Sequence, residues 1–199
     1  MARISNTETG KPNMPKLVVY NSMSLDGYFT DANGDMSWAH KQDPEWQAFV
    51  KENASGGGQL LFGRKTYEMM AGFWSTAVAM QSNPVVAERL NALPKFVCST
   101  TLQQADWNNT TLLKGELTDE VRTLKQQAGP DIVLMGSGSV VSQLTEAGLI
   151  DEYQIVLNPL VVGQGRTLFE GVQRKLPMKL ARSRPFANGN VVLFYEPAA

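Results

Sequence analysis

A strand-like run passes through a glycine- and serine-rich turn directly into a helix pattern. Residues 132–135 read Ile-Val-Leu-Met, residues 136–139 read Gly-Ser-Gly-Ser, and Val140, Val141 and Leu144 continue at helical spacing. A turn of this kind presents free backbone N–H groups at the positive end of a helix dipole, which suits a phosphate. The alternative is a tight strand-to-helix turn without a ligand. The candidate anion-binding residues here are Gly136, Ser137, Gly138 and Ser139.

A second turn of related design follows the apolar run at residues 60–62. It consists of Gly63, Arg64, Lys65 and Thr66. The helix dipole disfavours cations at a helix N-terminus, so two cations there indicate an anion between them. Two solvated charges on an exposed turn are the alternative. Two phosphate-binding turns in one chain predict a ligand with several phosphates, such as a dinucleotide.

A third turn, with Ser99 and Thr100, follows a strand pattern at residues 96–98. These hydroxyls either contact another phosphate oxygen or simply cap the end of the strand. If all these strands are parallel, their carboxyl ends meet at one edge of the sheet, where α/β proteins bind ligands. We therefore expect the turns to gather at that edge, together with the turn at residues 24–27.

The order of the elements predicts the fold class. Strands alternate with helices and are then followed by strands alone, which indicates an α/β protein with a mostly parallel sheet and an antiparallel C-terminal hairpin. The expected strands are at 16–23, 59–62, 96–98, 111–113, 132–135, 150–158, 179–186 and 191–196. Helices are expected from Pro44 with Asp43 as N-cap, at 65–70, at 85–92, from a cap at Thr118, and at 138–147. Residues 24–38 read as a loop, and residues 72–83 have no clear pattern.

Composition restricts the possible partners and the compartment. The chain of 199 residues favours one domain, at 15–199, after a flexible tail at 1–14. Its 18 Lys and Arg stand against 19 Asp and Glu, so nothing in the overall charge attracts nucleic acid or an anionic membrane. One cysteine, Cys98, and one histidine, His40, predict neither a disulfide nor a metal site. No apolar run reaches a membrane span and no signal peptide is evident, so we expect a cytoplasmic protein.

Taken together, the motifs resemble a known family. They are Ser24-Leu25-Asp26-Gly27-Tyr28, Gly34-Asp35-Met36-Ser37-Trp38, Leu61-Phe62-Gly63-Arg64-Lys65-Thr66-Tyr67-Glu68, Gly136-Ser137-Gly138-Ser139, Leu149-Ile150-Asp151-Glu152 and Gly163-Gln164-Gly165-Arg166-Thr167-Leu168-Phe169. In this order and spacing, over residues 16–196, they resemble the C-terminal reductase domain of the riboflavin-biosynthesis protein RibD. The resemblance implies a dihydrofolate reductase-like fold, an NADPH-dependent reductase and a homodimer.

The same resemblance assigns roles in coenzyme binding. Arg64, Lys65 and Thr66 would hold the adenosine 2′-phosphate and the pyrophosphate, and Ser99 and Thr100 would lie on the 2′-phosphate side. The backbone of residues 136–139 would hold the pyrophosphate, and Gly63 would also belong to the coenzyme-binding residues. Asn21 would lie near the nicotinamide, and Gly163 and Gly165 would form a wall beside it, unless they form a plain glycine turn. An arginine at the 2′-phosphate favours NADPH over NADH.

Reduction of a C=N or C=O group also needs a proton, from a carboxylic acid or an ordered water. Asp43 and Asp26 are the candidate acids. A helix cap is the alternative role for Asp43, and turn chemistry is the alternative for Asp26. Tyr28, Trp38 and Trp74 are candidates for a slot that stacks a flat heterocyclic substrate, with core packing as the competing explanation.

Three functions remain open from the sequence. The first is reduction of a small, heterocyclic C=N or C=O substrate by NADPH. The second is the riboflavin-pathway reaction of a 5-amino-6-(5-phosphoribosylamino)uracil reductase. The third is a non-catalytic protein that binds or sequesters a nucleotide.

Overall fold

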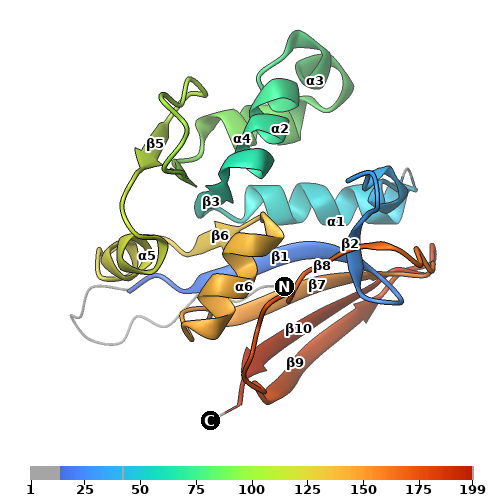
Figure 1. The fold of residues 1–199 in the computed structure, drawn as a ribbon. Coiled ribbons are helices and arrows are strands. Elements are labelled where there is room, and N and C mark those ends of the chain that lie inside the picture. Colours follow the sequence, from blue (N-terminus) through green and yellow to red (C-terminus); the bar gives the residue numbers. More distant parts are fainter. Residues whose placement is uncertain (1–13, 42, 199) are drawn as a thin grey trace, which may run out of the picture.

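The computed structural model describes residues 14–41 and 43–198, so the expected tail at 1–14 lies outside it except for Met14. Within these residues, ten strands form an eight-stranded sheet of order β5-β4-β3-β6-β1-β7-β10-β9 and a separate β2-β8 ribbon (Figure 1). The strands are β1 (Leu17–Ser24), β2 (Tyr28–Asp31), β3 (Gln59–Gly63), β4 (Lys95–Cys98), β5 (Thr110–Leu113), β6 (Ile132–Leu134), β7 (Glu152–Asn158), β8 (Gly165–Thr167), β9 (Met178–Pro185) and β10 (Val191–Pro197). The helices are α1 (Pro44–Ser55), α2 (Arg64–Trp74), α3 (Ala77–Ser82), α4 (Pro84–Ala92), α5 (Leu117–Lys125) and α6 (Gly138–Glu146), with a 3₁₀ turn η1 (Ser37–Ala39).

The large sheet has the predicted mixed topology. Strands β5, β4, β3, β6, β1 and β7 are all parallel to one another, whereas β10 is antiparallel to β7 and β9 is antiparallel to β10. This confirms the expected fold class, including the C-terminal hairpin. Because the central strands are parallel, the turns that follow β1, β3, β4 and β6 emerge at the same edge of the sheet.

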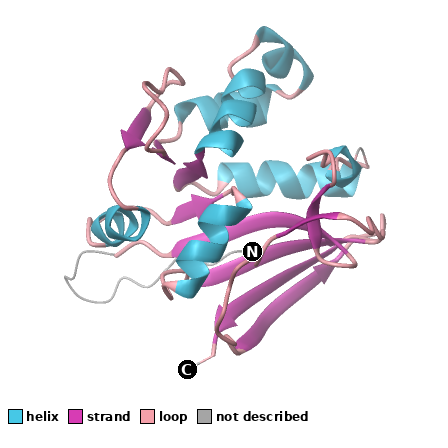
Figure 2. Ribbon diagram, viewed as in Figure 1, coloured by secondary structure: helices cyan, strands magenta, loops and turns pink. Residues whose placement is uncertain are grey.

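Helices cover both faces of the sheet (Figure 2). Side chains alternate along β3, so Leu61 faces the core under α5 and α6 while Leu60 and Phe62 face the core under α2 and α4. A third cluster joins α1 to β7 and the C-terminal hairpin through Trp46, Phe49, Val156, Phe186, Val192 and Phe194. The continuous apolar runs of the central strands follow from burial on both faces.

Two regions differ from the sequence-based expectation. Residues 24–38 are not simply a loop, because Tyr28–Asp31 pairs with Gly165–Thr167 to form the β2-β8 ribbon. Four residues give little periodicity, and the partner strand lies far along the chain, so no local signal marked this strand. Helix α2 extends to Trp74, and α3 occupies half of the stretch at residues 72–83, for which the sequence shows no clear pattern.

The start of α5 also corrects a prediction. Its N-cap is Glu116 and not Thr118. The Glu116 carboxylate accepts hydrogen bonds from the backbone N–H groups of Thr118 at 2.8 Å and Asp119 at 3.1 Å. Thr118 itself lies in the first turn, where its hydroxyl donates to the same carboxylate at 2.6 Å. By contrast, α1 begins as predicted, with the Asp43 carboxylate capping the N–H of Trp46 at 2.9 Å.

Lys95 is buried at the first position of β4, with 1% of its surface exposed. Its ammonium group donates hydrogen bonds to the carbonyls of Leu90 and Leu93 at 2.7 Å each, and of Asn91 at 3.2 Å. It also lies 4.7 Å from the ring centre of Trp107. These carbonyls are at the C-terminal end of α4, where backbone acceptors lack partners within the helix. Lys95 therefore caps α4 from inside the core.

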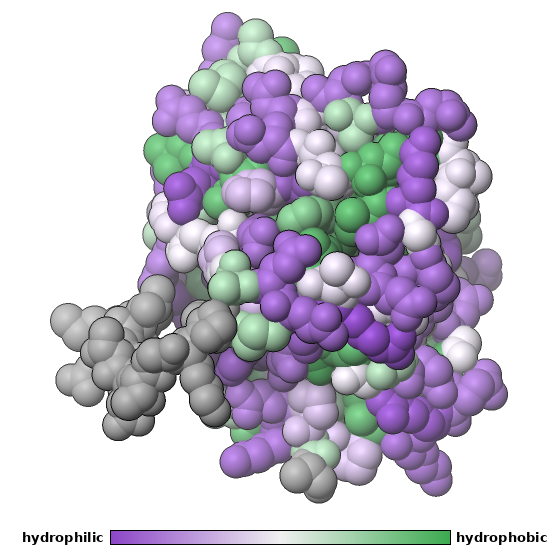
Figure 3. Space-filling model, turned by 90° about the vertical axis from the view of Figure 1, so that its left-hand side faces the viewer, coloured by the Kyte–Doolittle hydropathy of each residue, from purple (hydrophilic) through white to green (hydrophobic). Residues whose placement is uncertain are grey.

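The outer surface mixes polar and apolar side chains. On the face seen in Figure 3, hydrophilic residues surround a smaller hydrophobic area near the middle. Among the residues that the structure describes, no helix is both long and apolar enough to cross a bilayer. Over the same residues, no group of three or more His, Cys, Asp or Glu side chains is arranged to hold a metal ion.

Cys98 at the end of β4 provides a test of the packing. Burial raises the pKa of its thiol to about 12, and the charge of Glu120 adds to the effect. Since the thiolate is the reactive form, we expect the folded protein to react with an aromatic disulfide reagent at pH 8 roughly 1,000-fold more slowly than the chain in urea. Comparable rates in the two conditions would contradict this burial. Absorbance at the wavelength of the released thiolate measures both rates.

Candidate active site

The two predicted phosphate-binding turns, residues 63–66 and 136–139, lie against each other. The N–H of Gly63 donates to the carbonyl of Gly136 at 2.9 Å. A Cβ atom added to Gly63 would lie 2.6 Å from Ser137 Oγ and 2.9 Å from Val140 Cγ2. Only glycine allows so close an approach, and it brings the N-termini of α2 and α6 side by side. We call this pair of turns the paired helix starts.

Neither helix in this pair is capped by a side chain. Gly63 and Ser137 occupy the N-cap positions of α2 and α6, and neither cap makes a side-chain hydrogen bond. In contrast, Asp43, Thr76 and Glu116 cap α1, α3 and α5 through their side chains. The paired helix starts therefore offer backbone N–H groups and two positive dipole ends to an anion. This arrangement fits the pyrophosphate of a dinucleotide.

Two polar side chains, those of Thr66 and Asn21, border the turn at residues 136–139. Gly136 has φ +108°, which favours glycine, and a Cβ there would lie 3.2 Å from Thr66 Oγ1 and 3.9 Å from Asn21 Oδ1. Asn21 is 8% exposed, and its Nδ2 is buried without a hydrogen-bond partner among the described residues. A buried amide donor without a partner costs stability, so a ligand acceptor here would satisfy it. Phe29 of β2 packs on Gly138 in the same turn, where an added Cβ would meet the ring at 2.7 Å.

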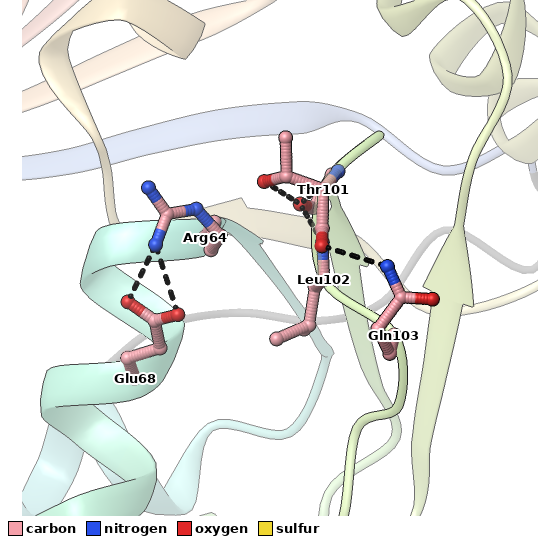
Figure 4. A network of polar contacts seen from close by, with 6 residues as sticks. Arg64, Glu68, Thr101, Leu102 and Gln103 are labelled. Carbon is pink, nitrogen blue, oxygen red and sulfur yellow. Dashed lines mark hydrogen bonds and ion pairs between the residues drawn. The ribbon is translucent and has the colours of Figure 1, made fainter.

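Arg64 begins α2 and makes an ion pair one turn along the helix. Its Nη1 lies 3.0 Å and 3.1 Å from the two carboxylate oxygens of Glu68 (Figure 4). Both side chains line a cavity of about 670 Å³ between α2 and the segment that follows β4. The other lining residues are Thr101, Leu102, Gln103, Gln104 and Asp106. Lys65 is exposed on the same turn.

The hydroxyl of Ser99 stabilises its own turn. It accepts hydrogen bonds from the N–H groups of Leu102 at 2.9 Å and Thr101 at 3.2 Å. This is the strand-end cap that was the alternative to phosphate binding, while Thr100 is exposed beside it. A ligand role for Ser99 and Thr100 stays a prediction.

The Asp26 carboxylate ties together two loops at the site. It accepts hydrogen bonds from the Ser24 hydroxyl at 2.6 Å and from the N–H groups of Val162 at 3.1 Å and Gly163 at 2.8 Å. These bonds, led by the one from Ser24, lower the pKa of Asp26 to about 2. A carboxylate that is ionised at neutral pH cannot donate a proton, so the geometry favours the turn role for Asp26.

Asp43 has a similar structural role. Besides capping α1, its carboxylate accepts a 2.6 Å hydrogen bond from Nδ2 of Asn188, in the turn between β9 and β10. Hydrogen bonding, led by the N–H of Trp46, lowers the pKa of Asp43. Asp43 thus joins α1 to the C-terminal hairpin, and its assignment as proton donor stays a prediction that the geometry does not favour.

The remaining predicted residues do not all meet in one place. Gly165 packs against β2, where an added Cβ would lie 1.9 Å from the carbonyl oxygen of Thr30, so its close approach holds the β2-β8 ribbon together. Trp74 packs with the core cluster between α2 and α4, whereas Tyr28 lies in the β2-β8 ribbon and Trp38 in η1. The substrate role of these aromatic residues and the wall formed by Gly163 and Gly165 stay predictions.

Several residues that line the cavity do not belong to any of the predicted turns. Glu68 could have been found, because it lies four residues after Arg64 on the predicted helix and such pairs meet on a helix surface. Gln104 and Asp106 belong to an irregular segment without periodicity. They also border an adjoining cavity of about 930 Å³ that extends over Tyr67 and Trp107.

Replacing Gly63 by alanine tests the contact between the paired helix starts. The added methyl group would lie too close to Ser137 Oγ, so we expect a loss of about 1–3 kcal/mol in the free energy of unfolding. Urea denaturation measures this loss. Gly72→Ala is the matched control, because Gly72 lies within α2, the helix that Gly63 precedes, and a Cβ there would meet nothing within 4 Å. Alanine has a higher helix propensity than glycine, so Gly72→Ala should stabilise the protein by about 0.5–1 kcal/mol. Equal effects of the two substitutions would contradict the close contact.

Comparison with known proteins decides the family. The RibD C-terminal domain matches residues 15–192 of this chain. The chain belongs to the RibD C-terminal domain family. This confirms the resemblance drawn from the motifs, and membership supports an oxidoreductase.

The chain is also similar to two relatives from one bacterium and, in fold, to solved structures. The uncharacterized proteins YyaP and YwjB of Bacillus subtilis are each 26% identical to the chain, over 91% and 92% of its length and 94% and 98% of theirs. The fold is similar to that of a putative riboflavin biosynthesis protein from Shewanella sp. PV-4, with TM-score 0.71 and 22% identity over 92% of this chain and 99% of that one. It is also similar to that of dihydrofolate reductase from Enterococcus faecalis complexed with NADP(H), with TM-score 0.61 and 15% identity. That likeness covers 94% of this chain and 98% of the reductase.

Proposed function

We propose that this member of the RibD C-terminal domain family is an NADPH-dependent reductase of a small, heterocyclic C=N or C=O substrate. The main supporting observation is the pair of uncapped helix starts, which meet at the carboxyl edge of the parallel strands. Arg64 at the start of α2 adds a guanidinium that can bind a phosphate in bidentate fashion. A cytoplasmic location, which rests on the sequence composition, and a homodimer, which rests on the family resemblance alone, are further parts of this proposal.

The chain's residues would bind and orient the coenzyme. Backbone N–H groups of residues 64–66 and 136–139 would hold the pyrophosphate, with the Thr66 hydroxyl beside them. Arg64, and Lys65 on the exposed side, would receive the 2′-phosphate. The unpaired amide of Asn21 would donate to an acceptor of the coenzyme or substrate. When bound, the coenzyme supplies the hydride.

The proton comes from water in this proposal. Asp26 and Asp43 have lowered pKa values and both serve as hydrogen-bond acceptors within the fold. The Asp26 contacts with Val162 and Gly163 would instead fix the loop that follows β7 beside the site. Its role is then to shape the site, and an ordered water delivers the proton.

The riboflavin-pathway reaction is the second candidate. The family match favours it, and a relative of known fold carries the corresponding name: a diaminohydroxyphosphoribosylaminopyrimidine deaminase/5-amino-6-(5-phosphoribosylamino)uracil reductase from Thermotoga maritima. The chain has TM-score 0.67 and 16% identity to that protein, and spans 57% of its length. A likeness at this identity shows the fold and leaves the substrate open.

Coenzyme titration followed by turnover tests the proposal. Isothermal calorimetry with NADPH should show binding, and NADPH should raise the melting temperature. NADPH oxidation is then followed with the ribosylamino-pyrimidine and with a panel of cyclic imines and carbonyls. Oxidation with the pyrimidine would establish the riboflavin reaction. Binding without turnover on any substrate would indicate a sequestering protein, and the absence of binding heat with millimolar NADPH and NADH would refute a coenzyme site.

A further inference from the structure

The guanidinium that the proposed function assigns to the 2′-phosphate already has a partner. Arg64 Nη1 donates to both oxygens of Glu68, and the two side chains are 41% and 45% exposed. Figure 4 shows them side by side on the first turns of α2, opposite the segment from Thr101 to Gln103. A phosphate could reach this face of Arg64 only by displacing the Glu68 carboxylate or by lying next to it.

The charges around the cavity do not favour a phosphate. Of its lining side chains, Arg64 is positive, whereas Glu68 and Asp106 are negative. The rest of the lining is neutral and comes from residues 101–104. A phosphate dianion placed here would gain one guanidinium contact and meet two carboxylates. This charge pattern differs from a site built for a phosphate, which gathers cations.

A ribose hydroxyl meets these same groups differently. Carboxylates accept hydrogen bonds from ribose hydroxyls and so favour NADH, whereas an arginine accommodates the 2′-phosphate of NADPH. This cavity is lined by a group of each kind, the carboxylate of Glu68 and the guanidinium of Arg64, one helical turn apart. Because the ion pair is half exposed, it contributes at most about 1 kcal/mol, so Arg64 can leave Glu68 at little cost.

We propose that Glu68 is a specificity-determining residue that weakens discrimination between the two coenzymes. It competes with the 2′-phosphate for Arg64 and accepts a hydrogen bond from the 2′-hydroxyl of NADH, so the site takes both NADPH and NADH. This inference rests on the proposed coenzyme site, and it concerns only the adenosine end of that site. Glu68 acts on affinity and not on hydride transfer.

The test is Glu68→Gln, which keeps the size of the side chain and removes its charge. We expect the variant to bind NADPH and 2′-AMP about 5- to 20-fold more tightly than the wild type, since the phosphate no longer meets this carboxylate. NADH should bind equally or more weakly, because a carboxylate is a stronger acceptor than an amide. Calorimetric titration at low and high salt measures these affinities, and the gain should shrink as salt screens the charges.

Asp119→Asn is the matched control. Asp119 forms a surface ion pair with Arg122 on α5 at 2.8 Å, and α5 packs over the other face of the sheet. Removing the charge of Asp119 should leave the affinities for NADPH and NADH unchanged. The inference is overturned if wild-type protein binds NADPH and Glu68→Gln changes neither its affinity nor the NADPH-to-NADH ratio. If the wild type binds neither coenzyme, the proposed function fails as well, so the two failures are distinguishable.

Discussion

Replacing Lys95 by methionine is expected to lower the free energy of unfolding by about 3 kcal/mol. The substitution keeps the volume of the side chain but removes the donor to the carbonyls of Leu90, Asn91 and Leu93. A buried acceptor that loses its partner costs about 1–3 kcal/mol, and methionine can replace none of these hydrogen bonds. The contact with Trp107 is also lost. We therefore expect α4 to loosen at its C-terminal end.

Urea denaturation measures this loss, and Lys51→Met provides the control because Lys51 is exposed in the middle of α1. Burial also lowers the pKa of Lys95 from 10.5 to about 8. Between pH 8 and pH 10.5 the unfolded chain binds a proton at Lys95 that the folded protein does not bind. The contribution of Lys95 to the free energy of unfolding therefore rises with pH in this window. The difference between wild type and Lys95→Met should therefore grow from pH 8 to pH 10. A loss below about 1 kcal/mol would contradict the capping role.

Replacing Arg64 by alanine is expected to weaken NADPH binding by about 1.5–3 kcal/mol, or roughly 10- to 150-fold. The variant loses the guanidinium and leaves Glu68 facing the phosphate without its counter-ion. NADH lacks the 2′-phosphate, so its affinity should change by less than about twofold. Fluorescence titration with both coenzymes measures the two affinities.

Arg122→Ala is the control for this substitution, since it removes a similar exposed cation from α5. It should leave NADPH binding unchanged. Equal losses of NADPH and NADH affinity in Arg64→Ala would mean that Arg64 supports the fold of the turn and does not recognise the 2′-phosphate.

Local patterns in the sequence were sufficient for the main framework. The apolar runs that became β1, β3, β4 and β6 are buried on both faces, so they stand out from their polar neighbours. The turn glycines at Gly63 and Gly136 mark the two places where backbones approach closely. Parallel pairing then follows from the alternation of strands and helices, and it implies the shared edge where the turns meet.

Other features depended on partners distant in the sequence. Ribbon β2-β8 joins Tyr28–Asp31 to Gly165–Thr167, and neither segment is long enough to show a period of its own. Lys95 reads as a charged residue at a strand start, yet the end of α4 gives it three acceptors inside the core. Asp26 and Asp43 carry the residue type of a general acid, and only their neighbours show that their carboxylates hold loops and a hairpin in place.

The sequence by itself determined the order of the elements, the parallel core of the sheet and the two glycine turns, because these depend on hydrophobic periodicity and backbone freedom at neighbouring residues. The tertiary structure alone decided what each polar side chain does. Hydrogen bonding and charge act through space over a few ångströms, as between Arg64 and Glu68 or between Asp43 and Asn188. The chemistry of such a group is set by whichever residues the fold places beside it, and their identity is not written next to it in the chain.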